Sequence, residues 1–154
     1  MHYITSSTVQ THIVANKILK SYLKNNKVLF FLLYGNLGSG KTEFVKGIAK
    51  GLGFNERQIK SPTFLYVTEI INKKNKLFHI DFYRIEKKFV RDIIYDLIEN
   101  VDLEKRNQVF CFEWANKISF KTESLLRNIK NSKIVKINLK IVSSSKREII
   151  VNES

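Results

Sequence analysis

The sequence has one cysteine, one proline and one tryptophan, and none of its six glycines lies outside residues 35–53. The single cysteine, Cys111, excludes an internal disulfide, and its apolar neighbours favour a buried, reduced thiol. No apolar run approaches the ~20 residues that a transmembrane helix needs, and residues 1–7 lack the apolar core of a signal peptide. These absences predict a soluble cytoplasmic protein with no membrane partner.

Acidic residues are also scarce, with 14 Asp and Glu against 27 Lys and Arg and a formal net charge of +13. A basic surface favours polyanions such as nucleotides and RNA. The lysines are scattered along the chain, however, and the many Asn and Ile residues indicate a general compositional bias, so the charge is weak support for a nucleic-acid site. The length of 154 residues and the hydrophobic content of 44% predict one domain over residues 1–154.

The first three glycines belong to the octet Gly35-Asn-Leu-Gly-Ser-Gly-Lys-Thr42, which matches the phosphate-binding pattern G-x-x-x-x-G-K-[ST]. In such a P-loop the backbone N–H groups form an anion-binding nest, Lys41 reaches the β- and γ-phosphates, and the Thr42 hydroxyl binds Mg²⁺. Upstream, the apolar run Val28–Tyr34 predicts a parallel strand buried on both faces. Downstream, apolar residues at helical spacing predict a helix with Gly53 at its C-cap.

The rest of the pattern predicts an α/β fold, a three-layer P-loop NTPase-like domain. A first helix is expected from Ser6, Ser7 or Thr8 to about Leu23, with Val9, Ile13, Ile18, Leu19 and Leu23 as its apolar face. Further helices are expected over 90–101 and 124–129, and strands over 64–71, 77–82, 109–112, 135–141 and 148–152. Because the strands 64–71 and 77–82 form a hairpin, the central sheet is expected to be mixed, mostly parallel, with a C-terminal antiparallel strand pair.

Two carboxylates follow apolar strands and are candidates to act beside Mg²⁺. Asp81 ends the run 77–80 and Glu113 ends the run 109–112, which places both at an edge of the sheet. In a P-loop enzyme such an acid holds the ion or positions water, and the alternative for each is an exposed acid in a turn. Spacing does not assign the two roles. Lys41, Asp81 and Glu113 are the predicted catalytic residues.

Three other features near these acids are open to two interpretations. Ser61-Pro62-Thr63 interrupts the pattern before a strand, and its hydroxyls suit either a switch that senses the γ-phosphate or an ordinary turn. His79 is flanked by apolar residues, which favours a structural role over that of a base. Trp114 directly follows Glu113 and is either a core residue or a wall of the site.

Motifs that are missing from the sequence limit which nucleotide and which reaction are expected. No glycine follows Gly53, so the Asp-x-x-Gly switch of GTPases is absent, and Asn116-Lys-Ile-Ser119 lacks the Asp of the guanine-reading motif. ATP is therefore the expected nucleotide. No Arg-rich lid of the small-kinase type is evident, which favours a hydrolase or switch. A small-molecule P-loop kinase and a nucleotide-sensing RNA-binding module stay as alternatives.

Taken in order, the P-loop octet, Ser61-Pro-Thr-Phe64, His79-Ile-Asp-Phe-Tyr-Arg84 and Phe112-Glu-Trp114 resemble the TsaE family of small bacterial ATPases. The likeness runs from about Thr8 to Trp114. It implies an ATP- and Mg²⁺-dependent hydrolase that works with a TsaB–TsaD-like complex. That complex transfers a threonylcarbamoyl group to the adenosine next to the anticodon of tRNAs that read ANN codons. The resemblance implies that contact of this chain with tRNA is indirect or weak, and hydrolysis is expected to be slow without the partners.

The resemblance also implies the residues that bind the cofactors. Leu37, Gly38, Ser39, Gly40, Lys41 and Thr42 contact phosphates, and Thr42, Asp81 and Glu113 serve the metal ion. Trp114 lies beside the nucleotide, Ser61 and Thr63 belong to a switch-like segment, the first helix contributes Thr8 or Thr11, and the last turn contributes Lys146 or Arg147. The chain departs from the family pattern at Asn36, where Asp is usual, and at Ala115, where Pro is frequent; neither change removes a predicted ligand.

Overall fold

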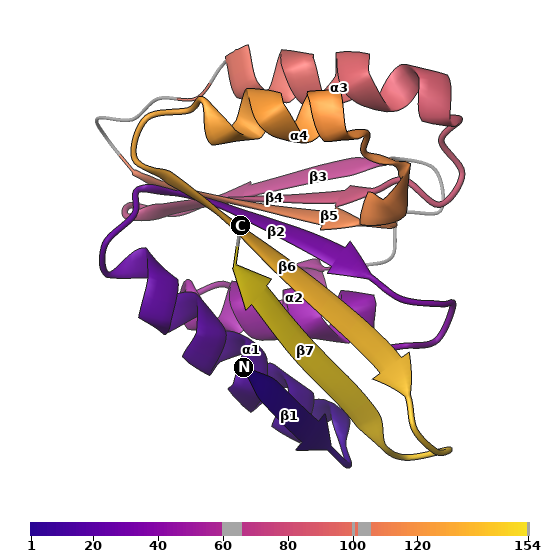
Figure 1. Ribbon diagram of the computed structural model, residues 1–154. Helices are drawn as coiled ribbons and strands as arrows, with labels where there is room; N and C mark the ends of the chain where they lie inside the picture. Colours follow the sequence, from indigo (N-terminus) through magenta and orange to yellow (C-terminus); the bar gives the residue numbers. More distant parts are fainter. Residues whose placement is uncertain (60–65, 100, 102–105, 154) are drawn as a thin grey trace.

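The computed structural model of the protein describes residues 1–59, 66–99, 101 and 106–153. In these residues seven strands form one sheet, in the order β1-β7-β6-β2-β5-β4-β3, with helices on both faces (Figure 1). The strands are β1 (His2–Thr5), β2 (Val28–Tyr34), β3 (Val67–Ile71), β4 (Asn75–Asp81), β5 (Asn107–Glu113), β6 (Ser132–Ile141) and β7 (Arg147–Glu153). The helices are α1 (Thr8–Leu23), α2 (Lys41–Gly51), α3 (Lys87–Glu99) and α4 (Phe120–Arg127), with 3₁₀ turns η1 (Glu56–Gln58) and η2 (Ala115–Lys117). No helix of the described residues is long and apolar enough to cross a bilayer.

The sheet is parallel in the middle and antiparallel at both edges. β2 pairs in parallel with β5 on one side and with β6 on the other, and β4 pairs in parallel with β5. β3 forms a hairpin with β4, and β7 runs antiparallel to both β6 and β1. The expected mixed sheet, hairpin and C-terminal strand pair are confirmed. β1 was not expected from the sequence; it is defined by its pairing with β7, from His2↔Ile150 to Thr5↔Arg147.

Side chains of the sheet alternate between two hydrophobic layers. Residues 28–33 of β2 are all fully buried. Leu29, Phe31 and Leu33 pack with α1 and α2, and the residues between them pack with α3 and α4 on the other face. β2 is therefore the doubly buried strand that its apolar run predicts. Cys111 of β5 is buried and free, as its apolar neighbours predict.

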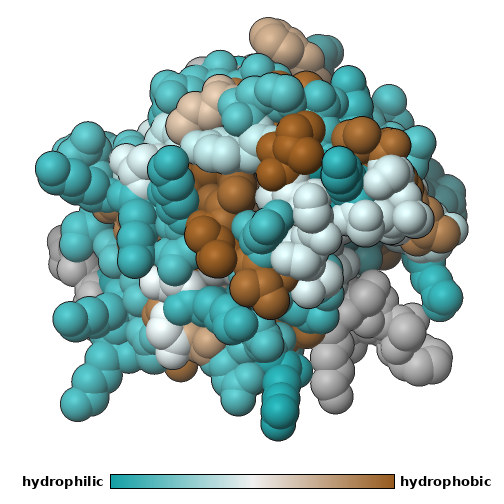
Figure 2. Space-filling view, turned by 90° about the horizontal axis from the view of Figure 1, so that it is seen from below, coloured by the Kyte–Doolittle hydropathy of each residue, from teal (hydrophilic) through white to brown (hydrophobic). Residues whose placement is uncertain are grey.

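The apolar face expected for α1 is partly wrong. Val9 and Ile13 are each 62% exposed. They belong to the helix that lies with β1 on the lower side of the molecule, and the view of that side in Figure 2 shows hydrophobic residues gathered amid hydrophilic ones. The approach of α2 explains the difference, because a Cβ added at Gly47 of α2 would lie only 2.7 Å from the Cβ of Ala15. The small Ala15 has to face α2, and this turns Val9 and Ile13 outward.

Helix ends follow local capping signals. The side chain of Ser7 accepts the N–H of Gln10 and starts α1 within the expected range. The C-cap of α2 is Leu52 rather than the expected Gly53; Gly53, with φ of +83°, follows it, and the N–H of Phe54 donates to the carbonyl of Ala49. α4 begins four residues before the expected start at 124, because the Ser119 side chain caps it, and α3 begins three residues before residue 90.

Candidate nucleotide-binding site

The carboxyl ends of the parallel strands bring the P-loop and both predicted acids to one edge of the sheet. β2 leads into the loop, and α2 begins at Lys41. Asp81 and Glu113 are the last residues of β4 and β5 and lie opposite each other in the ladder. Glu113 also pairs with Leu33 of β2, so it lies next to the start of the loop. Neighbouring strands, far apart in the sequence, therefore supply the two acids.

Gly35 is required where β2 turns into the loop. Its φ is +145°, and an added Cβ would lie 2.4 Å from the carbonyl oxygen of Leu139 in β6. The loop leaves the sheet in close contact with β6 and reaches α2 through its N-cap residue, Gly40. Gly40 provides no side-chain cap, so the first N–H groups of α2 are available to an anion.

Lys41 is folded back onto its own loop. Its Nζ donates to the carbonyl oxygens of Gly35, at 2.8 Å, and Asn36, at 3.0 Å. The same ammonium group lies 4.2 Å from the centroid of the Trp114 ring, within cation–π range. Burial lowers the pKa of Lys41, an effect that the nearby carboxylates of Glu113 and Asp81 oppose. In the described part of the chain its charge is held by carbonyl dipoles and a ring, so it can pair with an incoming anion.

Glu113 connects the P-loop helix to β4. Its Oε1 accepts the hydroxyl proton of Thr42 at 2.8 Å and lies 2.8 Å from Nε2 of His79. The Glu113 side chain is only 4% exposed. Because an ionised carboxylate only accepts, Nε2 of His79 carries the proton in this pair. Thr42 likewise donates its only hydroxyl proton, which leaves the lone pairs of its oxygen free for a cation.

Asp81 is half-buried and more open than Glu113. Its Oδ1 accepts the backbone N–H of Tyr83 at 2.8 Å. Burial raises the pKa of Asp81; the hydrogen bond from Tyr83 opposes this shift, and the charge of Glu113 adds to it. A carboxylate with a raised pKa is a better proton acceptor, a property that suits a group that positions water.

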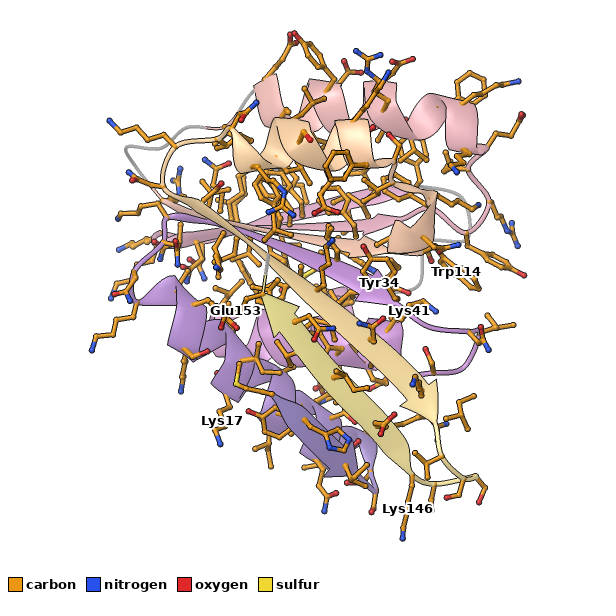
Figure 3. All side chains as sticks on the ribbon, in the orientation of Figure 1. Lys17, Tyr34, Lys41, Trp114, Lys146 and Glu153 are labelled. Carbon is orange, nitrogen blue, oxygen red and sulfur yellow. The ribbon has the colours of Figure 1, made fainter. Side chains whose placement is uncertain are left out.

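These groups surround a cavity of about 280 Å³. It is lined by Leu37, Gly38, Gly40, Lys41, Thr42, Glu43, Asp81, Tyr83, Glu113 and Trp114. Trp114 has a left-handed φ of +58°, and its ring packs on that of Tyr83 with centroids 4.9 Å apart. Figure 3 shows Lys41 and Trp114 together on the right, where the parallel strands end. The cavity has room for phosphate groups next to Lys41 and Thr42.

Three predicted residues of the loop and first helix lie outside this cavity. Ser39 is 1% exposed, and it lines a separate cavity of about 460 Å³ on the side of the loop that faces β6. Thr11 is buried with its Oγ1 3.0 Å from Oγ1 of Thr5, so its hydroxyl is engaged inside the protein. Thr8 is exposed as the first residue of α1. The structure does not bring Ser39, Thr8 or Thr11 to the cavity around Lys41.

The last turn approaches the P-loop through only one of its two candidate side chains. Nε of Arg147 donates to the carbonyl oxygen of Gly38 at 3.3 Å. Lys146 is exposed in the β6–β7 turn, and in Figure 3 it lies well below Lys41 and Trp114. The predicted switch residues Ser61 and Thr63 lie outside the described residues.

His79 and Tyr83 contact the site, although neither was among the predicted site residues. His79 has the structural role expected of it, but the group it supports is Glu113. A strand's side chains alternate, so the spacing of two residues between His79 and Asp81 puts both on one face. That spacing was the available signal. Nothing in the sequence pattern places Tyr83 against Trp114, because the contact depends on the backbone conformation after β5.

The residues that suit a metal ion here are oxygen donors. Among the described residues no group of three His, Cys, Asp or Glu side chains is arranged to hold a metal. Mg²⁺ keeps several waters and binds through one or two protein oxygens together with substrate phosphates. Thr42 Oγ1 and the carboxylates of Glu113 and Asp81 form such a partial ligand set beside the cavity.

The sheet lies between two layers of helices and has a glycine loop and two acids at its carboxyl edge. This arrangement places the protein in the class of P-loop NTPase-like α/β proteins. The crystal structure of Bacillus subtilis YdiB shares this fold, with a TM-score of 0.66 and 24% sequence identity over 100% of this chain and 86% of that one. The family model described as threonylcarbamoyl adenosine biosynthesis protein TsaE matches residues 5–149. The chain belongs to the TsaE family.

Curated relatives agree with this assignment. The tRNA threonylcarbamoyladenosine biosynthesis protein TsaE of Aquifex aeolicus is 39% identical over 106 residues, which cover 68% of this chain and 77% of that protein. The protein of the same name from Bacillus subtilis is 37% identical over 105 residues, 66% of this chain and 59% of that protein. The matched region thus spans less than two thirds of the Bacillus relative.

Proposed function

We propose that this protein binds ATP with Mg²⁺ at the cavity around Lys41 and hydrolyses it in support of tRNA threonylcarbamoyladenosine synthesis. The observation that carries the proposal is the placement of Lys41, Thr42 and Glu113 around one cavity at the P-loop. The synthesis of tRNA threonylcarbamoyladenosine is proposed because the curated relatives are named for it. Cytoplasm stays the proposed compartment, as expected from the sequence.

Each residue has a role in this proposal that its present contacts suggest. Bound Mg²⁺ supplies charge neutralisation at the β- and γ-phosphates. Thr42 would offer an oxygen lone pair to the ion while its hydroxyl proton is donated to Glu113, and His79 keeps that carboxylate in place. Lys41 exchanges its two carbonyl contacts for phosphate oxygens. Asp81, with its raised pKa, orients the attacking water and accepts its proton.

We further propose that hydrolysis is slow until a partner binds. The lining of the cavity, as far as the structure describes it, contains no arginine, and Arg147 contacts the loop only through the Gly38 carbonyl. An arginine or other positioning group supplied in trans raises the rate of phosphoryl transfer by ~10³–10⁵. A TsaB–TsaD-like complex, which transfers the threonylcarbamoyl group to tRNA, is the proposed source of that group.

Calorimetry with ATP and ADP tests the nucleotide site directly. We expect 1:1 binding by the folded protein and none by Lys41→Ala. The matched control is Lys50→Ala, since Lys50 is an exposed lysine at the other end of α2. Absence of binding by folded wild-type protein, or unchanged binding by Lys41→Ala, would refute the site. Phosphate release without transfer to nucleosides distinguishes an ATPase from a small-molecule kinase.

A pull-down with a TsaB–TsaD-like complex, with and without ATP, tests the partner. We expect nucleotide to change the amount of complex recovered, and we expect turnover to rise when the complex is added. Equal turnover by the isolated chain and by the full assembly would contradict the proposed dependence on the partner.

A further inference from the structure

A second surface lies at the opposite edge of the sheet, where the parallel strands begin. Six exposed lysines gather there, and we call them the amino-edge lysines: Lys20, Lys24, Lys27, Lys73, Lys74 and Lys130. They come from the end of α1, the start of β2, the β3–β4 turn and the start of β6. Helices that follow or precede parallel strands run back across the sheet, so helix ends and strand starts meet at this edge. The fold gathers lysines that are scattered in the sequence.

Backbone hydrogen bonds through β5 join three of these segments, the β3–β4 turn and the starts of β2 and β6, into one row, and the end of α1 leads into the start of β2. The Lys74 carbonyl accepts the N–H of Asn107 at 3.0 Å, and the Lys27 carbonyl accepts the N–H of Gln108 at 2.8 Å. The N–H of Lys27 in turn donates to the carbonyl of Asn131, the neighbour of Lys130, at 3.1 Å. The row crosses the starts of β4, β5, β2 and β6, and at ~4.8 Å between neighbouring strands it is about 15 Å long.

The β3–β4 turn that carries Lys73 and Lys74 is held in place by asparagines. Oδ1 of Asn72 accepts the backbone N–H groups of Lys74, at 3.0 Å, and Asn75, at 2.8 Å. Nδ2 of Asn72 and Nδ2 of Asn75 each donate to the Leu52 carbonyl at the end of α2, at 2.9 Å. The two lysines therefore extend from a backbone that is already ordered, which reduces the entropy cost of binding a ligand there.

The acids that the structure describes do not neutralise the charge of this row. None of the amino-edge lysines forms an ion pair with the acids that the structure describes, whereas Lys46, Lys50 and Lys76 each pair with a glutamate. Figure 3 shows nitrogen-tipped side chains that project from the left of the molecule, where β2 and β6 begin. In Figure 2, which views the molecule from below, the same left side is mainly hydrophilic. Within the described residues, the edge is an exposed row of lysines with no acidic partner.

We propose that the amino-edge lysines bind the phosphodiester backbone of RNA, and that the RNA is the tRNA whose modification the protein supports. The identity of the RNA rests on the proposed function; the binding itself does not. Lysines act as point charges that contact successive phosphates without reading bases. An anionic membrane is a poorer fit, because surface-bound segments also insert large apolar side chains, and among the described residues of this edge only Ile71 is exposed in that way.

RNA on this edge leaves the nucleotide site open. β2 connects the two edges, and its seven residues at ~3.3 Å each separate Lys27 from the P-loop by about 23 Å. ATP and RNA can therefore be bound at the same time. The contact also gives a reason for the excess of lysine over acid, since each phosphate contact adds affinity that depends on salt.

The test uses the full chain and a fluorescent in-vitro transcript of a tRNA that reads an ANN codon. Anisotropy titrations over a range of KCl compare wild type with Lys24→Glu/Lys73→Glu/Lys130→Glu. The control, Lys87→Glu/Lys88→Glu/Lys121→Glu, makes the same change of charge at exposed lysines of α3 and α4. At about 100 mM KCl we expect the amino-edge variant to bind at least about tenfold more weakly and its salt slope to fall by ~1 per lysine. The control should stay within about threefold of wild type.

Three results would overturn the proposal. The first is an equal loss of RNA affinity in both triple variants, which would show an effect of net charge alone. The second is unchanged RNA binding by the amino-edge variant. The third is tighter binding of the amino-edge row to vesicles rich in phosphatidylserine than to the RNA. Melting curves confirm that both variants fold. Lys41→Ala should bind RNA like wild type, so a failed nucleotide site and a failed RNA surface give different results.

Discussion

Thr42 and Glu113 are joined by a hydrogen bond of 2.8 Å that ties the second residue of α2 to the last residue of β5. The bond links the P-loop to an acid 71 positions away in the sequence. Because Leu33 of β2 pairs with Glu113, the sheet itself sets how closely the carboxylate approaches the loop. This part of the candidate nucleotide site is therefore attached to the centre of the sheet.

Glu113→Gln should weaken the dependence on Mg²⁺ without removing nucleotide binding. The amide oxygen can still accept the Thr42 hydroxyl, but the negative charge beside the ion is lost. Changes of groups that support a metal ligand commonly cost ~10–100-fold in metal affinity or activity. The measurement is phosphate release against Mg²⁺ concentration. The control is Glu123→Gln, a buried acid on α4 that pairs with Lys136; a shift of the same size there would contradict the role of Glu113.

Trp114 should report nucleotide binding through its fluorescence. It is the only tryptophan, and the Lys41 ammonium lies 4.2 Å from its ring centroid. Phosphates that draw Lys41 away from the ring change the environment of the indole. We expect emission to change with ADP or ATP, with its half-maximal change at the calorimetric Kd. In Lys41→Met the emission should stay constant on addition of nucleotide. A flat titration of wild-type protein with proven binding would remove Trp114 from the site.

Asp81→Asn should lower hydrolysis and raise the stability of the fold at neutral pH. Burial raises the pKa of Asp81 above its ordinary value of 3.8, so the ionised form is disfavoured in the folded state. The protonated acid contributes stability that is fully present below pH 3.8 and is lost as the pH rises through the folded-state pKa. The free energy of unfolding of the variant should therefore exceed that of the wild type at pH 7, and this difference should vanish below pH 3.8.

Denaturant unfolding of both proteins at several pH values provides the measurement for Asp81. Calorimetry on the same samples shows whether ATP still binds, as we expect. Equal stability of wild type and variant at all pH values would contradict the burial effect, and unchanged turnover would contradict the catalytic role.

Gly35→Ala should destabilise the fold by about 3 kcal/mol or more, because an unfavourable φ is combined with a Cβ pressed on the Leu139 carbonyl. Gly38→Ala is the matched control in the same loop. Gly38 also has a positive φ, of +75°, but an added Cβ meets nothing within 4 Å, so only the conformational cost of about 1–2 kcal/mol applies. Urea unfolding measures both. Equal losses would show that contact with β6 does not shape the loop.

Residues of the candidate site were predictable where they directly follow a strand that the sequence indicates clearly. The apolar run of β2 and the octet after it define the P-loop. Asp81 and Glu113 stand at the ends of apolar runs, and parallel strands place such ends at one edge. His79 was less visible, because a buried histidine has the same sequence pattern whether it supports a carboxylate or only fills space.

The sequence by itself determined the elements whose residues form a local signal: the buried strand, the glycine loop, a capped start of the first helix within residues 6–8, a glycine stop at the end of α2, and the acids at strand ends. Only the tertiary structure decided which face of α1 is buried, since the close approach of Gly47 selects Ala15 over the larger Val9 and Ile13. It also decided that His2–Thr5 is a strand and that Arg147 approaches the P-loop. These choices depend on steric fit and hydrogen bonding between segments far apart in the chain, which no local pattern of residues contains.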